Sequence, residues 1–112
     1  MQNGISKNRI GEIVDTLTAR HQIERVILFG SQSRGDANRD SDLDLFLIMN
    51  FEGNRRKLMV EMRDLFANIR HGIDILIAKP DEYEEDKLIP GTLARQVFLE
   101  GRVVYDGQNR IS

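Results

Sequence analysis

Aspartates lie close together in residues 30–49, GSQSRGDANRDSDLDLFLIM, directly before and inside an apolar run. Asp42 and Asp44 are two positions apart, so in an extended chain their side chains point to the same side. Carboxylates this close repel one another, and a carboxylate that leaves water needs a partner. The pair therefore indicates either a solvated acidic loop or a site that holds something positive.

A third aspartate interrupts the next strongly apolar stretch, IDILIA at 73–78. Asp74 alternates with isoleucines as Asp44 alternates with leucines, so both should lie opposite the core. A single aspartate is mostly an ordinary exposed residue, but aspartate is depleted in strands. If the two strands are neighbours, Asp42, Asp44 and Asp74 converge on one patch. Three carboxylates without cysteine or a nearby histidine suit Mg²⁺ or Mn²⁺ rather than zinc.

Two familiar loop patterns do not fit residues 30–51. A Walker A loop fails because Asp36 and Ala37 occupy the places of the required Lys and Ser or Thr. An EF-hand fails because Leu45 stands where Gly is needed and Phe51 where Glu is needed. Neither a P-loop nor a calcium loop is predicted.

The remaining pattern is Gly30-Ser31, ten residues, and then Asp42-x-Asp44. It resembles the GS-x10-D-x-D motif of the DNA polymerase beta-like nucleotidyltransferase superfamily. The surrounding LFGSQSRGDANRDSDLDL is especially similar to the minimal nucleotidyltransferases (MNT), which are antitoxins paired with HEPN-domain toxins. The resemblance extends through IDILI to the LEGRVVYD ending. It implies the nucleotidyltransferase fold.

The resemblance also implies roles for the site residues. The residues that would hold the nucleotide phosphates are Gly30, Ser31 and Arg34. The catalytic and metal-ligating residues would be Asp42, Asp44 and Asp74. Two Mg²⁺ (or Mn²⁺) ions would assist in-line transfer of AMP from ATP to a hydroxyl, and the third aspartate would accept the hydroxyl proton. Arg34 has an alternative interpretation, because in a surface loop it would simply balance neighbouring aspartates.

The acceptor hydroxyl is not specified by the motif. Nucleotidyltransferases that act on small molecules, tRNA or DNA generally carry extra domains, whereas nearly all of these 112 residues are needed for the catalytic sheet and its helices. The acceptor site should then come from another polypeptide, and the family pattern is a tyrosine of a HEPN toxin. Two alternatives stay open: an inhibitory module that blocks the toxin by contact, and a catalytic subunit that modifies a small molecule such as an aminoglycoside.

Composition agrees with a single domain over residues 1–112, with a frayed tail at about 107–112. Hydrophobic residues make up 40% and charged residues 30%, which is ordinary for a globular protein. Without cysteine, a disulfide framework and a thiolate metal site are excluded. No leader or membrane-length apolar run is visible, so a cytoplasmic protein is expected. The net charge of −2 argues against non-specific binding to nucleic acid.

The elements that must position these residues follow from hydrophobic periodicity and caps. Helices are expected from Ser6 to about 20, from Asn54 to about 69, over 81–87 and over 92–100. Strands are expected over 25–30, 43–49, 73–78 and 102–106. The basic cluster at 55–57 is interpreted as a solvated face, with the alternative that it joins the 31–41 loop in a surface that docks the partner. Met59 and Met62 are interpreted as core. The predicted fold is α/β (α+β), a small mixed β-sheet packed on helices, with the carboxylates on its open face.

Overall fold

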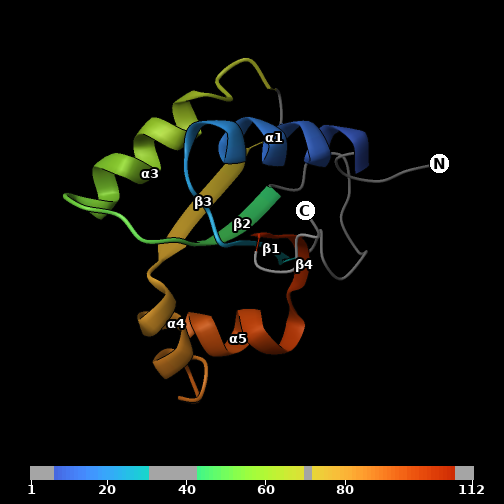
Figure 1. Cartoon of the computed structure of the whole chain (residues 1–112). Helices are drawn as coiled ribbons and strands as arrows, with labels where there is room; N and C mark the ends of the chain where they lie inside the picture. Colours follow the sequence, from blue (N-terminus) through green and yellow to red (C-terminus); the bar gives the residue numbers. More distant parts are fainter. Residues whose placement is uncertain (1–6, 31–42, 70–71, 108–112) are drawn as a thin grey trace.

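A four-stranded sheet forms the centre of the molecule, with helices above and below it (Figure 1). The computed structural model describes residues 7–30, 43–69 and 72–107. In chain order the elements are α1 (Lys7–Arg20), β1 (Arg25–Phe29), β2 (Leu43–Ile48), α3 (Arg55–Asp64), β3 (Ile73–Ala78), α4 (Pro80–Asp86), α5 (Leu93–Glu100) and β4 (Arg102–Asp106). The mixed sheet and its helices confirm the predicted fold class. No helix in these ranges is long and apolar enough to cross a bilayer.

The sheet has the strand order β3-β2-β1-β4. β1 runs antiparallel to both β2 and β4, whereas β2 and β3 are parallel. Parallel neighbours cannot be joined by a tight hairpin, and α3 supplies the crossover between them. This connection brings the beginnings of β2 and β3 to the same end of the sheet.

Each face of the sheet packs its own hydrophobic cluster. The larger cluster lies under α1 and α3 and includes the alternate residues of β2 and β3. Its fully or almost fully buried members include Ile13, Leu17, Leu43, Leu45, Leu47, Met62, Ile73, Ile75 and Ile77. The smaller cluster lies under α4 and α5 and consists of Ile27, Phe46, Ile48, Tyr83, Ala94 and Val97. Among the described residues, α4 and α5 leave one end of this second face open, where a pocket is lined by Phe29, Asp44 and Asp74.

The bounds of α3 and α4 differ from the sequence-based expectation. α3 ends at Asp64 rather than near residue 69, and Leu65 forms its C-cap. The sequence suggests a longer helix because apolar residues continue at helical spacing after Asp64. Phe66 and Ile69 lie in the turns that follow and still pack on the larger cluster. Pro80 is the first residue of α4, a position at which its missing N–H is not needed.

The N-termini of α3 and α4 are joined by an ion pair. Arg55 Nη2 donates to both carboxylate oxygens of Glu82 at 2.8 Å, and Glu82 also accepts the Lys79 N–H at 2.9 Å. The Lys79 N–H and then the Arg55 guanidinium lower the pKa of Glu82 below its ordinary value of 4.5. Phe51 lies against both cations, with its ring centre 5.3 Å from Arg55 and 5.0 Å from Lys79. The N-terminal end of α3 is therefore held in place.

Glu82→Gln should lower the free energy of unfolding by about 0.5 kcal/mol at pH 7. The effect is small because the paired side chains are 42% and 39% exposed and water screens them. Gln still accepts the Lys79 N–H, so only the charge is removed. Since folding lowers the pKa of Glu82, its charge stabilises the fold above pH 4.5, and this contribution is lost as pH falls through the folded pKa.

Urea unfolding at pH 7 and at pH 3 measures this difference. Glu85→Gln, at an exposed position of the same helix, is the control and should change little at either pH. An equal loss of stability for Glu82→Gln at both pH values would contradict the assignment to charge.

Candidate active site

Asp44 and Asp74 lie side by side on the uncovered end of the sheet. Each is the second residue of its strand, and the two are directly opposite in the parallel register of β2 and β3. Neighbouring strands are roughly 4.8 Å apart, so the carboxylates are close enough to share one cation. Asp44 is half-buried and Asp74 is exposed. The expectation that both aspartates point away from the leucine and isoleucine core is confirmed.

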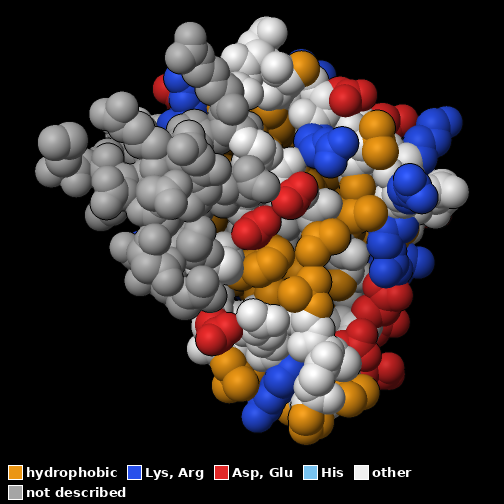
Figure 2. Space-filling view, turned by 180° about the vertical axis from the view of Figure 1, so that it is seen from behind, with side chains coloured by type: hydrophobic (Ala, Val, Ile, Leu, Met, Phe, Trp, Pro, Cys, Tyr) orange, Lys and Arg blue, Asp and Glu red, His pale blue; other side chains and the backbone are white. Residues whose placement is uncertain are grey.

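The surface around the carboxylates carries acidic, hydrophobic and basic side chains. Figure 2 shows acidic side chains near the centre of one face, a hydrophobic band beside them, and basic side chains both next to them and toward one edge. Phe29 pairs with Asp44 across β1 and β2 and lines the same pocket. The Phe29 ring packs edge-on against Phe46, with centroids 6.4 Å apart. The carboxylates thus stand at the edge of an apolar floor.

Gly30 explains why the motif begins with glycine. Its φ is +75°, in the left-handed region that side chains rarely adopt. A Cβ built on Gly30 would lie 2.5 Å from Oδ2 of Asp44, which is too close for any real contact. The chain therefore leaves β1 by passing directly against the Asp44 carboxylate, and a side chain at position 30 would have to displace that carboxylate or the backbone.

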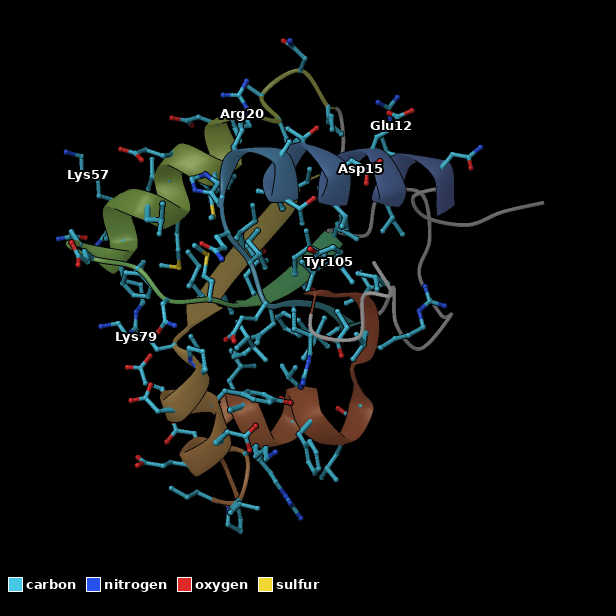
Figure 3. The ribbon with its side chains drawn as sticks, in the orientation of Figure 1. Glu12, Asp15, Arg20, Lys57, Lys79 and Tyr105 are labelled. Carbon is cyan, nitrogen blue, oxygen red and sulfur yellow. The ribbon has the colours of Figure 1, made fainter. Side chains whose placement is uncertain are left out.

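One side of α3 forms a wall beside the two aspartates. An open pocket of about 460 Å³ is lined by Phe29, Asp44, Arg56, Met59, Val60, Arg63, Asp74, Ile75 and Leu76. Arg56 and Arg63 are seven residues apart, two helical turns, so they lie on the same side of α3. Neither forms an ion pair with another described residue. Lys57 projects from the outer side of the same helix (Figure 3).

The sequence predicts only part of this wall. It places Arg56 in a basic cluster that is also a candidate for the docking surface, and it assigns no role to Arg63. Met59 packs against the larger cluster, as predicted. Met62 is fully buried as expected, but Met59 is half-buried and also lines the pocket. The sequence indicates this wall through helical spacing, which places four residues on one side of the helix: Arg56, Met59, Val60 and Arg63.

The donor set fits a hard divalent cation. Asp44 and Asp74 supply carboxylate oxygens on adjacent strands, which are the ligands that Mg²⁺ and Mn²⁺ prefer. Among residues 7–30, 43–69 and 72–107, no three acidic, His or Cys side chains gather into a metal site. The other predicted site residues, Ser31, Arg34 and Asp42, lie outside the described residues.

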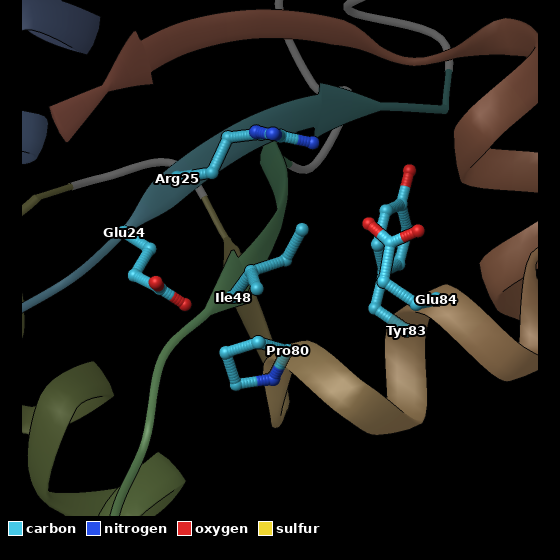
Figure 4. Close-up of a pocket in the computed structure, with 6 residues that line it drawn as sticks. All are labelled: Glu24, Arg25, Ile48, Pro80, Tyr83 and Glu84. Atoms are coloured by element: carbon cyan, nitrogen blue, oxygen red, sulfur yellow. The ribbon is translucent and has the colours of Figure 1, made fainter. Parts of the chain in front are cut away.

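A smaller pocket of about 70 Å³ lies where α4 meets the sheet (Figure 4). It is lined by Glu24, Arg25, Ile48, Pro80, Tyr83 and Glu84. Burial raises the pKa of the Tyr83 phenol, so this hydroxyl stays protonated at neutral pH. Ile48 is at the other end of β2, four residues from Asp44 and so roughly 13 Å away. This pocket is a packing gap distant from the paired aspartates.

Comparison with known proteins identifies the family. The family described as Polymerase beta, Nucleotidyltransferase matches residues 11–110. This chain belongs to that nucleotidyltransferase family. A Methanocaldococcus jannaschii protein named protein adenylyltransferase is 31% identical over 100 residues, which are 86% of this chain and 94% of that protein. The chain is thus a nucleotidyltransferase enzyme, as the motif predicted.

Solved structures show the same fold. A crystal structure of a toxin–antitoxin with AMP-PNP is 20% identical, covers 93% of this nucleotidyltransferase and 76% of its own chain, and has a TM-score of 0.63. A Sulfolobus solfataricus structure named as a nucleotidyltransferase is 21% identical, covers 97% and 96% of the two chains, and has a TM-score of 0.60. These likenesses confirm the predicted nucleotidyltransferase fold.

Proposed function

We propose that this nucleotidyltransferase transfers AMP from ATP to a tyrosine hydroxyl of a HEPN-type partner toxin and so acts as its antitoxin. The observation that carries the proposal is the pairing of Asp44 with Asp74 in register on the open end of the sheet. The relative named protein adenylyltransferase supports the reaction, and the toxin–antitoxin structure with AMP-PNP supports the kind of partner and the nucleotide. The HEPN class and the tyrosine rest on the motif resemblance.

Mg²⁺ or Mn²⁺ is the proposed cofactor, with Asp42, Asp44 and Asp74 as its protein ligands. Bound there, two such ions would supply charge neutralisation on the phosphates and acidify the attacking hydroxyl. The proposal assigns Gly30, Ser31 and Arg34 to the β- and γ-phosphates. Backbone N–H groups after a strand, a hydroxyl and a guanidinium are all suitable donors to phosphate oxygens.

The chain's own groups perform the remaining work. Asp74 is exposed at the start of β3, where its carboxylate can accept the proton of an incoming hydroxyl. The hydroxyl oxygen then bonds to the α-phosphorus, and the bond between that phosphorus and the oxygen bridging to the β-phosphate breaks. Pyrophosphate leaves with the electron pair of that bond. Rate enhancement comes mainly from positioning and from charge neutralisation.

A labelling experiment tests the proposed function. The nucleotidyltransferase, labelled ATP, Mg²⁺ and the HEPN-type protein encoded beside it are incubated, and the partner is examined by mass spectrometry. We expect an AMP-sized addition on a partner tyrosine and loss of toxicity. If the partner is neutralised while it stays unmodified, the chain acts by contact and the transferase proposal is wrong.

A further inference from the structure

We infer that the α3 side of the pocket is the acceptor site, and that Arg56 and Arg63 select a tyrosine flanked by acidic residues. The inference deepens the proposed function and rests on it for the direction of the reaction. The acceptor wall is defined as Arg56, Met59, Val60 and Arg63, which line one pocket together with Asp44 and Asp74.

The geometry of the displacement sets the side from which the acceptor hydroxyl approaches the α-phosphorus. In an in-line displacement, the incoming hydroxyl and the leaving pyrophosphate occupy opposite sides of the phosphorus. Gly30, the described residue of the proposed phosphate-holding set, directly follows β1 and lies against the Asp44 carboxylate from the β1 side. The opposite side of Asp44 is β3, which carries Asp74 and packs against α3. The hydroxyl therefore enters along the acceptor wall.

The chemistry of the pocket favours an aromatic acceptor. Met59, Val60 and Leu76 present apolar surface, and Val60 is 45% exposed although it is a large hydrophobic residue. An aromatic ring would cover this surface and place its hydroxyl at the carboxylates. Arg56 and Arg63 are both exposed and form no ion pair within the described part of the chain. Two guanidiniums that form no ion pair with a described residue, beside an apolar wall, favour a ligand that combines an aromatic ring with anionic groups.

The spacing of the two arginines fits a short extended peptide. Seven residues of α-helix correspond to roughly 10 Å along the axis. An extended peptide covers this length in about three residues. Carboxylates on either side of a tyrosine match such a pair, whereas a single small anion does not. The fixed N-terminus of α3, held by Asn54 and by the Arg55–Glu82 ion pair, keeps the two arginines in place before the acceptor arrives.

The test uses two short synthetic peptides with a central tyrosine, one flanked by glutamates and one by glutamines. Wild type should prefer the glutamate peptide by about 10-fold in kcat/KM, the size expected for charge-assisted hydrogen bonds at a solvated site. In the double variant Arg56→Gln/Arg63→Gln this preference should disappear, while the KM for ATP stays unchanged. The matched control is Lys57→Gln, which removes an exposed cation from the outer side of the same helix and should keep the preference.

A binding measurement makes the result independent of catalysis. Fluorescence anisotropy of the labelled glutamate peptide, recorded without ATP, should show weaker binding to the double variant and unchanged binding to Lys57→Gln. A rise in the KM for ATP with no change in peptide preference would assign the arginines to the nucleotide and overturn the inference. If wild type binds the glutamate peptide through these arginines but transfers no AMP to peptide or partner, the proposed function fails and only the peptide-binding role of the two arginines stands.

Discussion

Asp44→Asn is expected to reduce AMP transfer by about 10³-fold or more while the protein stays folded. Charge stabilisation by a bound divalent ion contributes several kcal/mol to such transition states, and each 1.4 kcal/mol is tenfold in rate. Asn matches Asp in size, and Asp44 lies at the uncovered end of the sheet rather than in either hydrophobic cluster. The substitution therefore removes charge from the site without removing core packing.

Two measurements check this result: transfer of labelled AMP to the partner, and the rise in Tm on adding ATP with Mg²⁺. Binding to the native state alone raises Tm, so Asp44→Asn should lose most of that rise. Asp74→Asn should slow transfer strongly but keep more of the rise, because the proposed proton acceptor is removed. Asp15→Asn on α1 is the control and should resemble wild type (Figure 3). A wild-type response of Asp44→Asn to ATP and Mg²⁺ would show that the site is misassigned.

Gly30→Ala is expected to lower transfer by about 100-fold, because misplacing a catalytic group by about 1 Å costs this much. The new Cβ would lie 2.5 Å from Oδ2 of Asp44, so the carboxylate or the backbone must move. The left-handed backbone adds about 1–2 kcal/mol of strain for any residue with a side chain. Both activity and stability should fall, for two separable reasons.

Gly53→Ala separates these two reasons. Gly53 also has a positive φ, +86°, but a Cβ there meets nothing within 4 Å. Urea unfolding should show a loss from backbone strain in both variants. AMP transfer should fall sharply in Gly30→Ala and stay close to wild type in Gly53→Ala. Equal activity losses in the two variants would mean that contact with Asp44 is not the cause.

The position of the carboxylates could be predicted because strand alternation is a local property. Leu43 and Leu45 are strongly apolar, so Asp44 between them must lie on the opposite side of β2. The same reasoning applies to Asp74 between Ile73 and Ile75, and the parallel register then brings the two aspartates together. The strand order and the direction of β3 were not predicted from the sequence, because they depend on contacts between distant segments.

The α3 wall could not be predicted with the same accuracy. Hydrophobic spacing identifies which side of a helix is buried, but the exact rotation of a helix on its sheet is set by tertiary packing. Met62 fills the core, and a modest rotation places Met59 at its margin, where it borders the pocket. The same rotation places Arg63 beside the pocket, since Arg63 lies on the same side of the helix as Arg56. Only the packed structure shows that this side adjoins Asp74.

The uncovered end of the sheet also bears on how relatives of this enzyme could diverge. The residues that hold the strands in register are the buried leucines and isoleucines on the far face, and substitutions among them are costly. Arg56, Val60 and Arg63 are exposed, and exposed substitutions typically change stability by less than about 0.5 kcal/mol. Selection can therefore replace these three residues step by step without endangering the fold or moving the carboxylates. The buried core must therefore be inherited unchanged, whereas the exposed residues of α3 can change when the partner changes.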